Sequence, residues 1–175
     1  MESGTETGTG GRPGPESWVR GPVGVPEPVP PAEVRASATA RRFSWVATHG
    51  GAGTTTLAAV YGGRDCGHAW PGPGDPPSVL LVARTHASGL DSVIRAMEAF
   101  RRGETPAGLD LDAVVLVADA PGRLPRPLSR RVRAVESVID VYHVPWVPAW
   151  RLGDLGGDRP RGAEALARLT RAARR

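Results

Sequence analysis

The residues of this sequence best suited to chemistry lie in a glycine- and threonine-rich segment, residues 48–57. The segment reads Thr-His-Gly-Gly-Ala-Gly-Thr-Thr-Thr-Leu, directly follows the apolar run Phe43–Ala47 and opens a predicted helix. Glycines at a turn between a strand and a helix let successive main-chain N–H groups point at one anion, and neighbouring hydroxyls can bind its Mg²⁺. The segment therefore predicts a phosphate-binding loop. The alternative is a structural turn in which threonine hydroxyls cap the helix.

Such loops normally carry a lysine that contacts the phosphates, and this chain has no lysine. Thr54 stands at the lysine position, and all 22 residues in the Lys+Arg total are arginine. The loss removes a charge-assisted hydrogen bond worth about 1.5–3 kcal/mol. The loss should lower the rate of catalysis more than it weakens binding, because the cation acts on charge that develops during phosphoryl transfer. Arg84 is the predicted substitute, since arginine binds phosphate oxygens bidentately; the alternative for Arg84 is a surface charge or a carboxylate partner.

Four short apolar runs predict the strands that position this loop: Phe43–Ala47, Val79–Ala83, Ala113–Ala118 and Val141–Val144. Most lack polar alternation, as expected of parallel strands that are buried on both faces. Helices are predicted from Ser88, after Pro127 and from about Ala163. Ser88 and Asp91 have the spacing of a capping box, which predicts that Ser88 caps the first of these helices.

These elements predict a small three-layer, P-loop-like α/β domain over residues 41–175, with a mostly parallel sheet of about four strands. Nine of the sixteen residues 62–77 are Gly or Pro, which predicts a flexible loop there. If the strand order runs one way, right-handed crossovers place the connecting helices largely on one face of the sheet. The C-terminal helix, the N-terminal tail or a partner must then cover the other face.

The loop also resembles a known family. Residues 49–57, His-Gly-Gly-Ala-Gly-Thr-Thr-Thr-Leu, are similar to the deviant Walker A loop of the ParA/MinD ATPases, Lys-Gly-Gly-x-Gly-Lys-Thr-Thr. Residues 79–85 with 88–90 are similar to the strand and helix that follow the family's Walker B strand. Residues 114–119 resemble its next strand, and residues 141–146 resemble the strand before its final helices. The chain thus looks like a shortened, degenerate relative: His49 and Thr54 replace the two lysines, and the family's switch aspartate and Walker B strand are collapsed into residues 62–77.

The resemblance implies a site for ATP or GTP with Mg²⁺. The predicted ligand contacts are His49, Gly50, Gly51, Ala52, Gly53, Thr54, Thr55, Thr56, Arg84 and Asp119. Thr55 stands where the family's Mg²⁺-binding hydroxyl is found. Asp119 would hold Mg²⁺ through water if residues 119–122, Asp-Ala-Pro-Gly, form a switch element; otherwise it lies near the base or begins a turn.

The site is predicted at the carboxyl ends of the strands, where open parallel sheets bind ligands. That edge would also collect residues 84–86, 119–123 and 146–151. Trp146 and Trp150 could stack on a base there, or simply cover the end of the sheet.

Composition narrows the class of protein. Residues 1–40 are rich in Gly and Pro and have few large apolar side chains, which predicts a disordered tail and no secretory signal. No apolar run is long enough to span a bilayer, and the single cysteine, Cys66, suits a reducing compartment, so a cytoplasmic location is predicted.

The net charge is only +4 despite a pI of about 10.4. The absence of lysine points to a genome-wide bias toward arginine, so nucleic acid is not the expected partner.

The first hypothesis is a nucleotide- or phosphate-binding module with little or no hydrolysis, a pseudo-NTPase. The second is a protein-interaction or scaffold component of a larger bacterial machine, with a protein partner or self-association and no nucleotide. The third is a working NTPase whose cation is Arg84 or comes from a partner.

Overall fold

The predicted strands form one parallel sheet. The computed structural model describes residues 43–172, so the predicted tail at 1–40 lies outside the described part. Four strands correspond to the apolar runs: β1 (Phe43–Ala47), β3 (Ser78–Arg84), β4 (Asp110–Val117) and β5 (Asp140–Val144). All strand pairs are parallel. The α/β class and the parallel sheet predicted from the sequence are therefore confirmed.

The sheet has a fifth strand that the apolar pattern did not predict. The two-residue strand β2 (Arg64–Asp65) pairs with Ser44 and Trp45 of β1. Its residues are polar and it lies in the segment expected to be a loop, so hydropathy gave no sign of it. Pairing with a buried neighbour, and not apolar character, makes this segment a strand. The predicted mobility of residues 62–77 stays a prediction.

The strand order is β2-β1-β3-β4-β5. From β1 the chain passes through helix α1 (Thr54–Tyr61) to β2 at one edge, whereas from β3 it passes through α2 (Ala87–Arg101) to β4 in the opposite direction. The order therefore reverses between β1 and β3. In open α/β sheets such a reversal leaves a crevice beyond the carboxyl ends of the two strands, where ligands bind.

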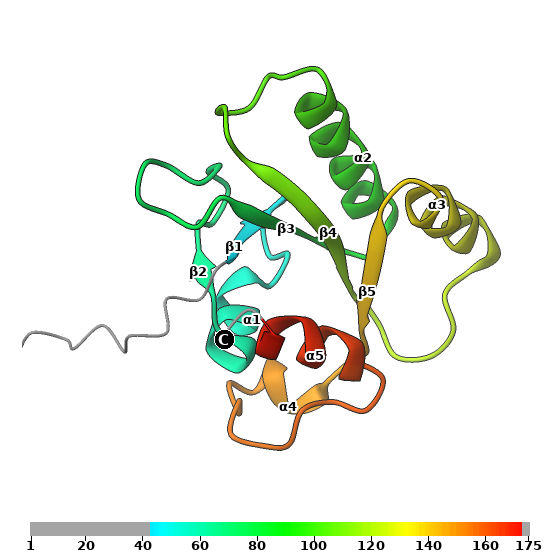
Figure 1. Cartoon of the computed structure of the whole chain (residues 1–175). Coiled ribbons are helices and arrows are strands. Elements are labelled where there is room, and N and C mark those ends of the chain that lie inside the picture. The colour runs from blue at the N-terminus through cyan, green and yellow to red at the C-terminus, as the bar shows by residue number, and fades with distance from the viewer. Residues whose placement is uncertain (1–42, 173–175) are drawn as a thin grey trace, which may run out of the picture. The chain divides into compact units, whose positions relative to one another are not determined.

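Helices cover both faces of the sheet, so the expectation of connecting helices largely on one face holds only in part (Figure 1). Helices α2 and α3 (Arg126–Glu136) lie over one face, and α1 and α5 (Glu164–Ala172) lie over the other. Helix α1 departs from the expectation because it connects β1 to β2, which lies on the opposite side of β1 from β3. Right-handed crossovers that run in opposite directions place their helices on opposite faces of the sheet. Of the three predicted covers for the second face, the C-terminal helix is the one observed, and it shares that face with α1. A short helix, α4 (Pro148–Arg151), precedes it.

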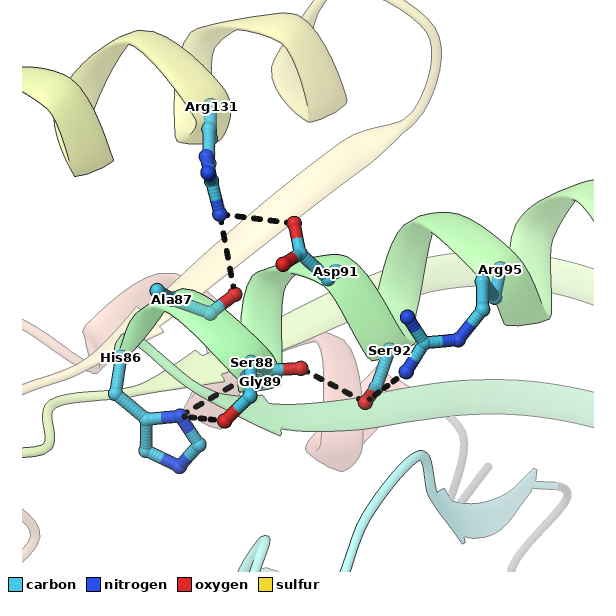
Figure 2. A network of polar contacts seen from close by, with 8 residues as sticks. All are labelled: His86, Ala87, Ser88, Gly89, Asp91, Ser92, Arg95 and Arg131. Atoms are coloured by element: carbon cyan, nitrogen blue, oxygen red, sulfur yellow. Dashed lines mark hydrogen bonds and ion pairs between the residues drawn. The ribbon is translucent and has the colours of Figure 1, made fainter.

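Helix α2 is capped by a histidine and not by the predicted Ser88. The helix begins at Ala87, and the Gly89 amide donates to His86 Nδ1 at 2.9 Å. Figure 2 shows the surrounding polar network, in which Arg131 of α3 donates to the Asp91 carboxylate at 2.8 Å. Asp91 is thus used by the neighbouring helix, so the predicted capping box is wrong.

Among the helices of residues 43–172, none combines the length and the apolar character that crossing a lipid bilayer requires.

Candidate functional site

The loop between β1 and α1 has a backbone that requires glycine at two positions. Gly51 and Gly53 have φ values of 73° and 108°, in the left-handed region that other residues rarely adopt. Gly53 precedes the first helical residue, and the first main-chain bond of the helix runs from Leu57 N to Gly53 O at 2.9 Å. No side chain of the described residues caps this helix. The amides of its first turn therefore face outward with the positive end of the helix dipole.

His49 joins the loop to the end of β3. The Arg84 amide donates to His49 Nε2 at 2.9 Å, and His49 Nδ1 lies 2.9 Å from Gly50 O. Gly89 makes room for this contact: a Cβ at Gly89 would lie 3.0 Å from His49 Nε2 and 2.3 Å from the Arg84 carbonyl oxygen. Burial lowers the pKa of His49 below its ordinary value. The Gly50 carbonyl opposes this shift, and the nearby cationic groups add to it.

The side chain of Arg84 lies against the same loop. Its Nε donates to Gly51 O at 3.2 Å and its Nη1 donates to Ala118 O, just beyond β4, at 3.0 Å. The remaining Nη2 is the nearest atom to Gly53, 3.9 Å from where a Cβ would stand. Partial burial lowers the pKa of Arg84, Asp119 raises it and Arg151 lowers it. Because an arginine remains charged in proteins, the residue brings a fixed cation to the loop.

A cavity of about 240 Å³ lies beside this cation, at the beginning of α1. Gly53 and Thr56 line one side, Arg84 lines a second, and Trp150 and Arg151 of α4 line a third. The lining contains no carboxylate, and neither arginine forms an ion pair within the described part of the chain. Two guanidinium groups and a helix N-terminus thus meet at one small hollow. This is an arrangement that favours an anion.

The hydroxyl predicted to hold Mg²⁺ is paired with a carboxylate that sequence reasoning missed. Thr55 Oγ1 donates to Asp65 Oδ2 at 2.7 Å, and the Gly67 amide donates to Asp65 Oδ1 at 2.9 Å. Burial alone would raise the pKa of Asp65, but these bonds and one from Thr54 outweigh it and hold that pKa below its ordinary value. Asp65 is therefore a carboxylate at neutral pH. The sequence signal that could have identified Asp65 was the resemblance to the ParA/MinD family, whose switch aspartate was expected within residues 62–77.

Asp119 is close enough to Arg84 to raise its pKa, but it lies apart from the Thr55–Asp65 pair. Its amide donates to Thr85 Oγ1 at 3.0 Å, and it lines a separate cavity of about 610 Å³ between α3 and the ends of β4 and β5. Among the described residues, Thr55 and Asp119 share neither a hydrogen bond nor a cavity. The structure thus brings Arg84 to the loop and its cavity, pairs Thr55 with Asp65 outside that cavity, and places Asp119 in a separate one.

The remaining predicted loop residues have distinct surroundings. Ala52 and Thr54 are buried, and Gly50, Gly51 and Thr55 are exposed. The buried Thr54 stands at the position of the missing lysine, so the lysine position here faces the protein and Asp65.

Comparisons with known proteins bear on the family alone. No curated protein and no solved structure matches the chain. The parallel sheet is compatible with the P-loop fold that the loop sequence predicts. A family profile matches residues 42–172, which is most of the chain. The protein therefore belongs to DUF6668, a family of unknown function.

Proposed function

We propose that this protein is a phosphate-binding module that holds its ligand with little or no hydrolysis. The observation that carries the proposal is the meeting of the uncapped start of α1 with the Arg84 guanidinium. Main-chain amides supply directional donors, and the arginine supplies the charge that the missing lysine would have brought. The Arg151 side chain at the same cavity adds a second positive charge.

Slow or absent hydrolysis is expected from the way Arg84 is used. Two of its nitrogens donate to main-chain carbonyls, Gly51 O and Ala118 O. A cation tied to its own fold supports ground-state binding, whereas phosphoryl transfer needs donors aimed at charge that develops in the transition state. The position that normally provides such a donor holds Thr54, whose side chain is buried.

The size of the cavity limits what it can enclose. Pockets that enclose a drug-sized ligand usually measure about 300–1,000 Å³, and this one measures about 240 Å³. A phosphate group fits these dimensions better than a whole nucleoside triphosphate. ATP and GTP remain the first ligands to test, with only their phosphates in the cavity.

Thr55 and Asp65 are the residues that would hold Mg²⁺ if the ligand brings it. A hydroxyl and a carboxylate 2.7 Å apart supply the oxygen ligands that Mg²⁺ prefers, and the ion normally completes its shell with water and substrate phosphate. Residues 43–172 contain no cluster of three or more His, Cys, Asp or Glu side chains suited to a metal. Metal binding should therefore require the phosphate. Bound Mg²⁺ would offset the repulsion between the negative charges of the Asp65 carboxylate and the phosphate.

Calorimetric titration with ATP, GTP, inorganic phosphate and sulfate, each with and without Mg²⁺, tests the proposal. Arg84→Gln should weaken binding roughly tenfold to hundredfold, because a hydrogen bond to a charged group is worth about 1.5–3 kcal/mol. Arg130→Gln, at an exposed position of α3, is the matched control. Wild-type protein that binds none of the four at millimolar concentration overturns the proposal. Phosphate release that disappears in Arg84→Gln would instead support a working NTPase.

A second candidate function, protein interaction, is favoured by an apolar hollow at the other end of the sheet. The hollow measures about 500 Å³ and lies between the ends of α2 and α3, where Met97, Phe100 and Ile139 line it. Val138 at its margin is 69% exposed. Light scattering over a range of protein concentrations tests whether this surface drives self-association, and a monomer at every concentration counts against that form of the hypothesis.

A further inference from the structure

The loop of the proposed phosphate site is held in place by an imidazole acting as an acceptor. The Arg84 amide can only donate, so His49 Nε2 must be the unprotonated nitrogen in their 2.9 Å bond. The proton of the neutral ring then lies on Nδ1, where Gly50 O accepts it at 2.9 Å. Both bonds of this ring therefore depend on one neutral tautomer.

A second histidine next to it has the same requirement. The Gly89 amide donates to His86 Nδ1 at 2.9 Å, so this nitrogen too must lack a proton. Figure 2 shows His86 at the beginning of α2 with its ring directed away from the Asp91–Arg131 pair. The centroids of the His49 and His86 rings are 4.9 Å apart. Protonating either ring removes an acceptor from a main-chain amide.

The groups around His49 make its protonation unfavourable. Arg84 faces it from the end of β3, His86 from the start of α2 and His68 from the segment between β2 and β3. Each of these is a cation or becomes one on protonation, and no carboxylate is among them. Burial is the largest cause that lowers the pKa of His49, and these three groups lower it further.

The consequence for the site follows from what Arg84 does. The Arg84 amide anchors the histidine, while its guanidinium holds Gly51 O and stands beside Gly53. Detaching His49 therefore removes the bond that joins the loop to the main chain of Arg84. The two bonds from Thr48 to Val82 O and the bond from Arg84 Nε to Gly51 O then hold the loop without it.

We propose that His49 is a positioning residue whose neutral imidazole helps to lock the loop to β3, so that acidification loosens the loop around Arg84 and weakens anion binding. The effect on anion binding, which is the functional half of this inference, rests on the proposed phosphate site, whereas the lock itself does not. If His49 acted through its charge instead, acidification would strengthen anion binding, since a protonated His49 would attract an anion. The two roles are therefore distinguished by the direction of the pH effect.

The lock is tested first without any ligand. The chain has four histidines, so four single His→Gln variants assign every imidazole signal in ¹⁵N NMR spectra. At a pH of about 8 we expect the Nδ1–H tautomer at His49, and as the pH falls toward about 5 the Arg84 amide should shift together with the His49 ring. An Nε2–H tautomer, or an Arg84 amide that does not follow the ring, overturns the lock.

The functional half is tested with sulfate, which remains a dianion from about pH 5 to about pH 8. Wild-type affinity should fall roughly fivefold or more on acidification, a usual size for coupling between two sites. His49→Gln keeps an acceptor that cannot titrate and should lose most of this pH dependence, and the double variant His49→Gln/His86→Gln should bind sulfate equally at both ends of the range. His143→Gln, on β5, should behave as wild type.

Each outcome has one meaning. Sulfate that binds more tightly at low pH, or a pH dependence that is undiminished in His49→Gln, overturns the positioning role. Sulfate that binds at no pH overturns the proposed function, while the NMR result still decides the lock.

Discussion

The cavity at the start of α1 and the hollow between α2 and α3 lie at opposite ends of the sheet and differ in chemistry. The first is small and brings two arginines and Thr56 together with apolar residues, and hydrogen bonds hold the Arg84 guanidinium in place. The second is larger and lined mainly by apolar side chains. Hydrogen bonds are directional and apolar contacts are not. Only the first can select a ligand by charge and geometry, whereas the second can select only by shape.

The reason for the difference lies in the topology. Strand order reverses at β1 and β3, so the first cavity lies at the carboxyl ends of the strands, where the start of α1 meets Arg84 at the end of β3. The hollow lies where two neighbouring helices on the same face end, and it is formed by the edges of their apolar stripes. Changes at the first region should therefore have large, specific effects, and changes at the second should have small ones.

The largest expected effect comes from Gly89→Ala. The added methyl would lie 2.3 Å from the Arg84 carbonyl oxygen, and backbone cannot move away as a flexible side chain could. We expect a loss of about 1–3 kcal/mol in the free energy of unfolding, the usual cost of overpacking, measured by urea denaturation. Gly50→Ala is the control, because no atom lies within 4 Å of its Cβ position. Equal stability of the two variants would show that α2 does not pack tightly on the end of β3.

The Thr55–Asp65 pair gives the next effect. If it holds Mg²⁺, chelating the metal should weaken ATP binding to the wild type roughly tenfold, equivalent to about 1.4 kcal/mol. Asp65→Asn should abolish this dependence on Mg²⁺, because the amide has no charge to neutralise. Calorimetry with and without EDTA measures it, with Asp91→Asn on α2 as the control. A metal effect that persists in Asp65→Asn would place the ion elsewhere.

A smaller effect is expected from pH. Because the pKa of His49 is lowered on folding from 6.5, the unfolded state binds more protons just below that pH. The stabilising contribution is complete above 6.5 and is lost as the pH falls toward the folded value. Urea midpoints from about pH 5 to about pH 8 should therefore decline more steeply on acidification in wild type than in His49→Gln. Parallel curves for the two proteins would contradict this.

The smallest effect is expected at the hollow. Val138→Glu replaces a side chain that is 69% exposed, so the free energy of unfolding should change by no more than about 0.5 kcal/mol. Sulfate affinity should be unchanged. If self-association occurs, light scattering should show less of it in this variant. A loss of sulfate affinity would mean that the two ends of the sheet are coupled.

Most of the fold could be predicted from the sequence, because long buried strands have a distinctive composition. The run Phe43–Ala47 coincides with β1, and the other three runs differ from β3, β4 and β5 by a few residues at the ends. β2 could not be predicted, since two polar residues acquire strand geometry only from their neighbour. The cap of α2 was missed because histidine is an uncommon N-cap and Ser88 has the expected pattern.

The site was predictable as a loop but not as a set of contacts. Glycine and threonine at fixed spacing identified residues 49–56, and the absence of lysine directed attention to Arg84. Nothing in the spacing linked Thr55 to Asp65, ten residues later, because their contact depends on β2 pairing with β1. Nor did spacing assign His49 to the Arg84 amide.

The sequence by itself determined the class of fold, the strand–loop–helix unit and the absence of a lysine from the whole chain, because composition and local periodicity are properties of the chain alone. Only the tertiary structure decided that β2 joins the sheet, that α1 and α2 lie on opposite faces and that Arg84 stands beside the loop. The physical reason is that these features depend on contacts between segments distant in sequence. Such contacts form only when buried strands pair and bring their polar ends to one edge.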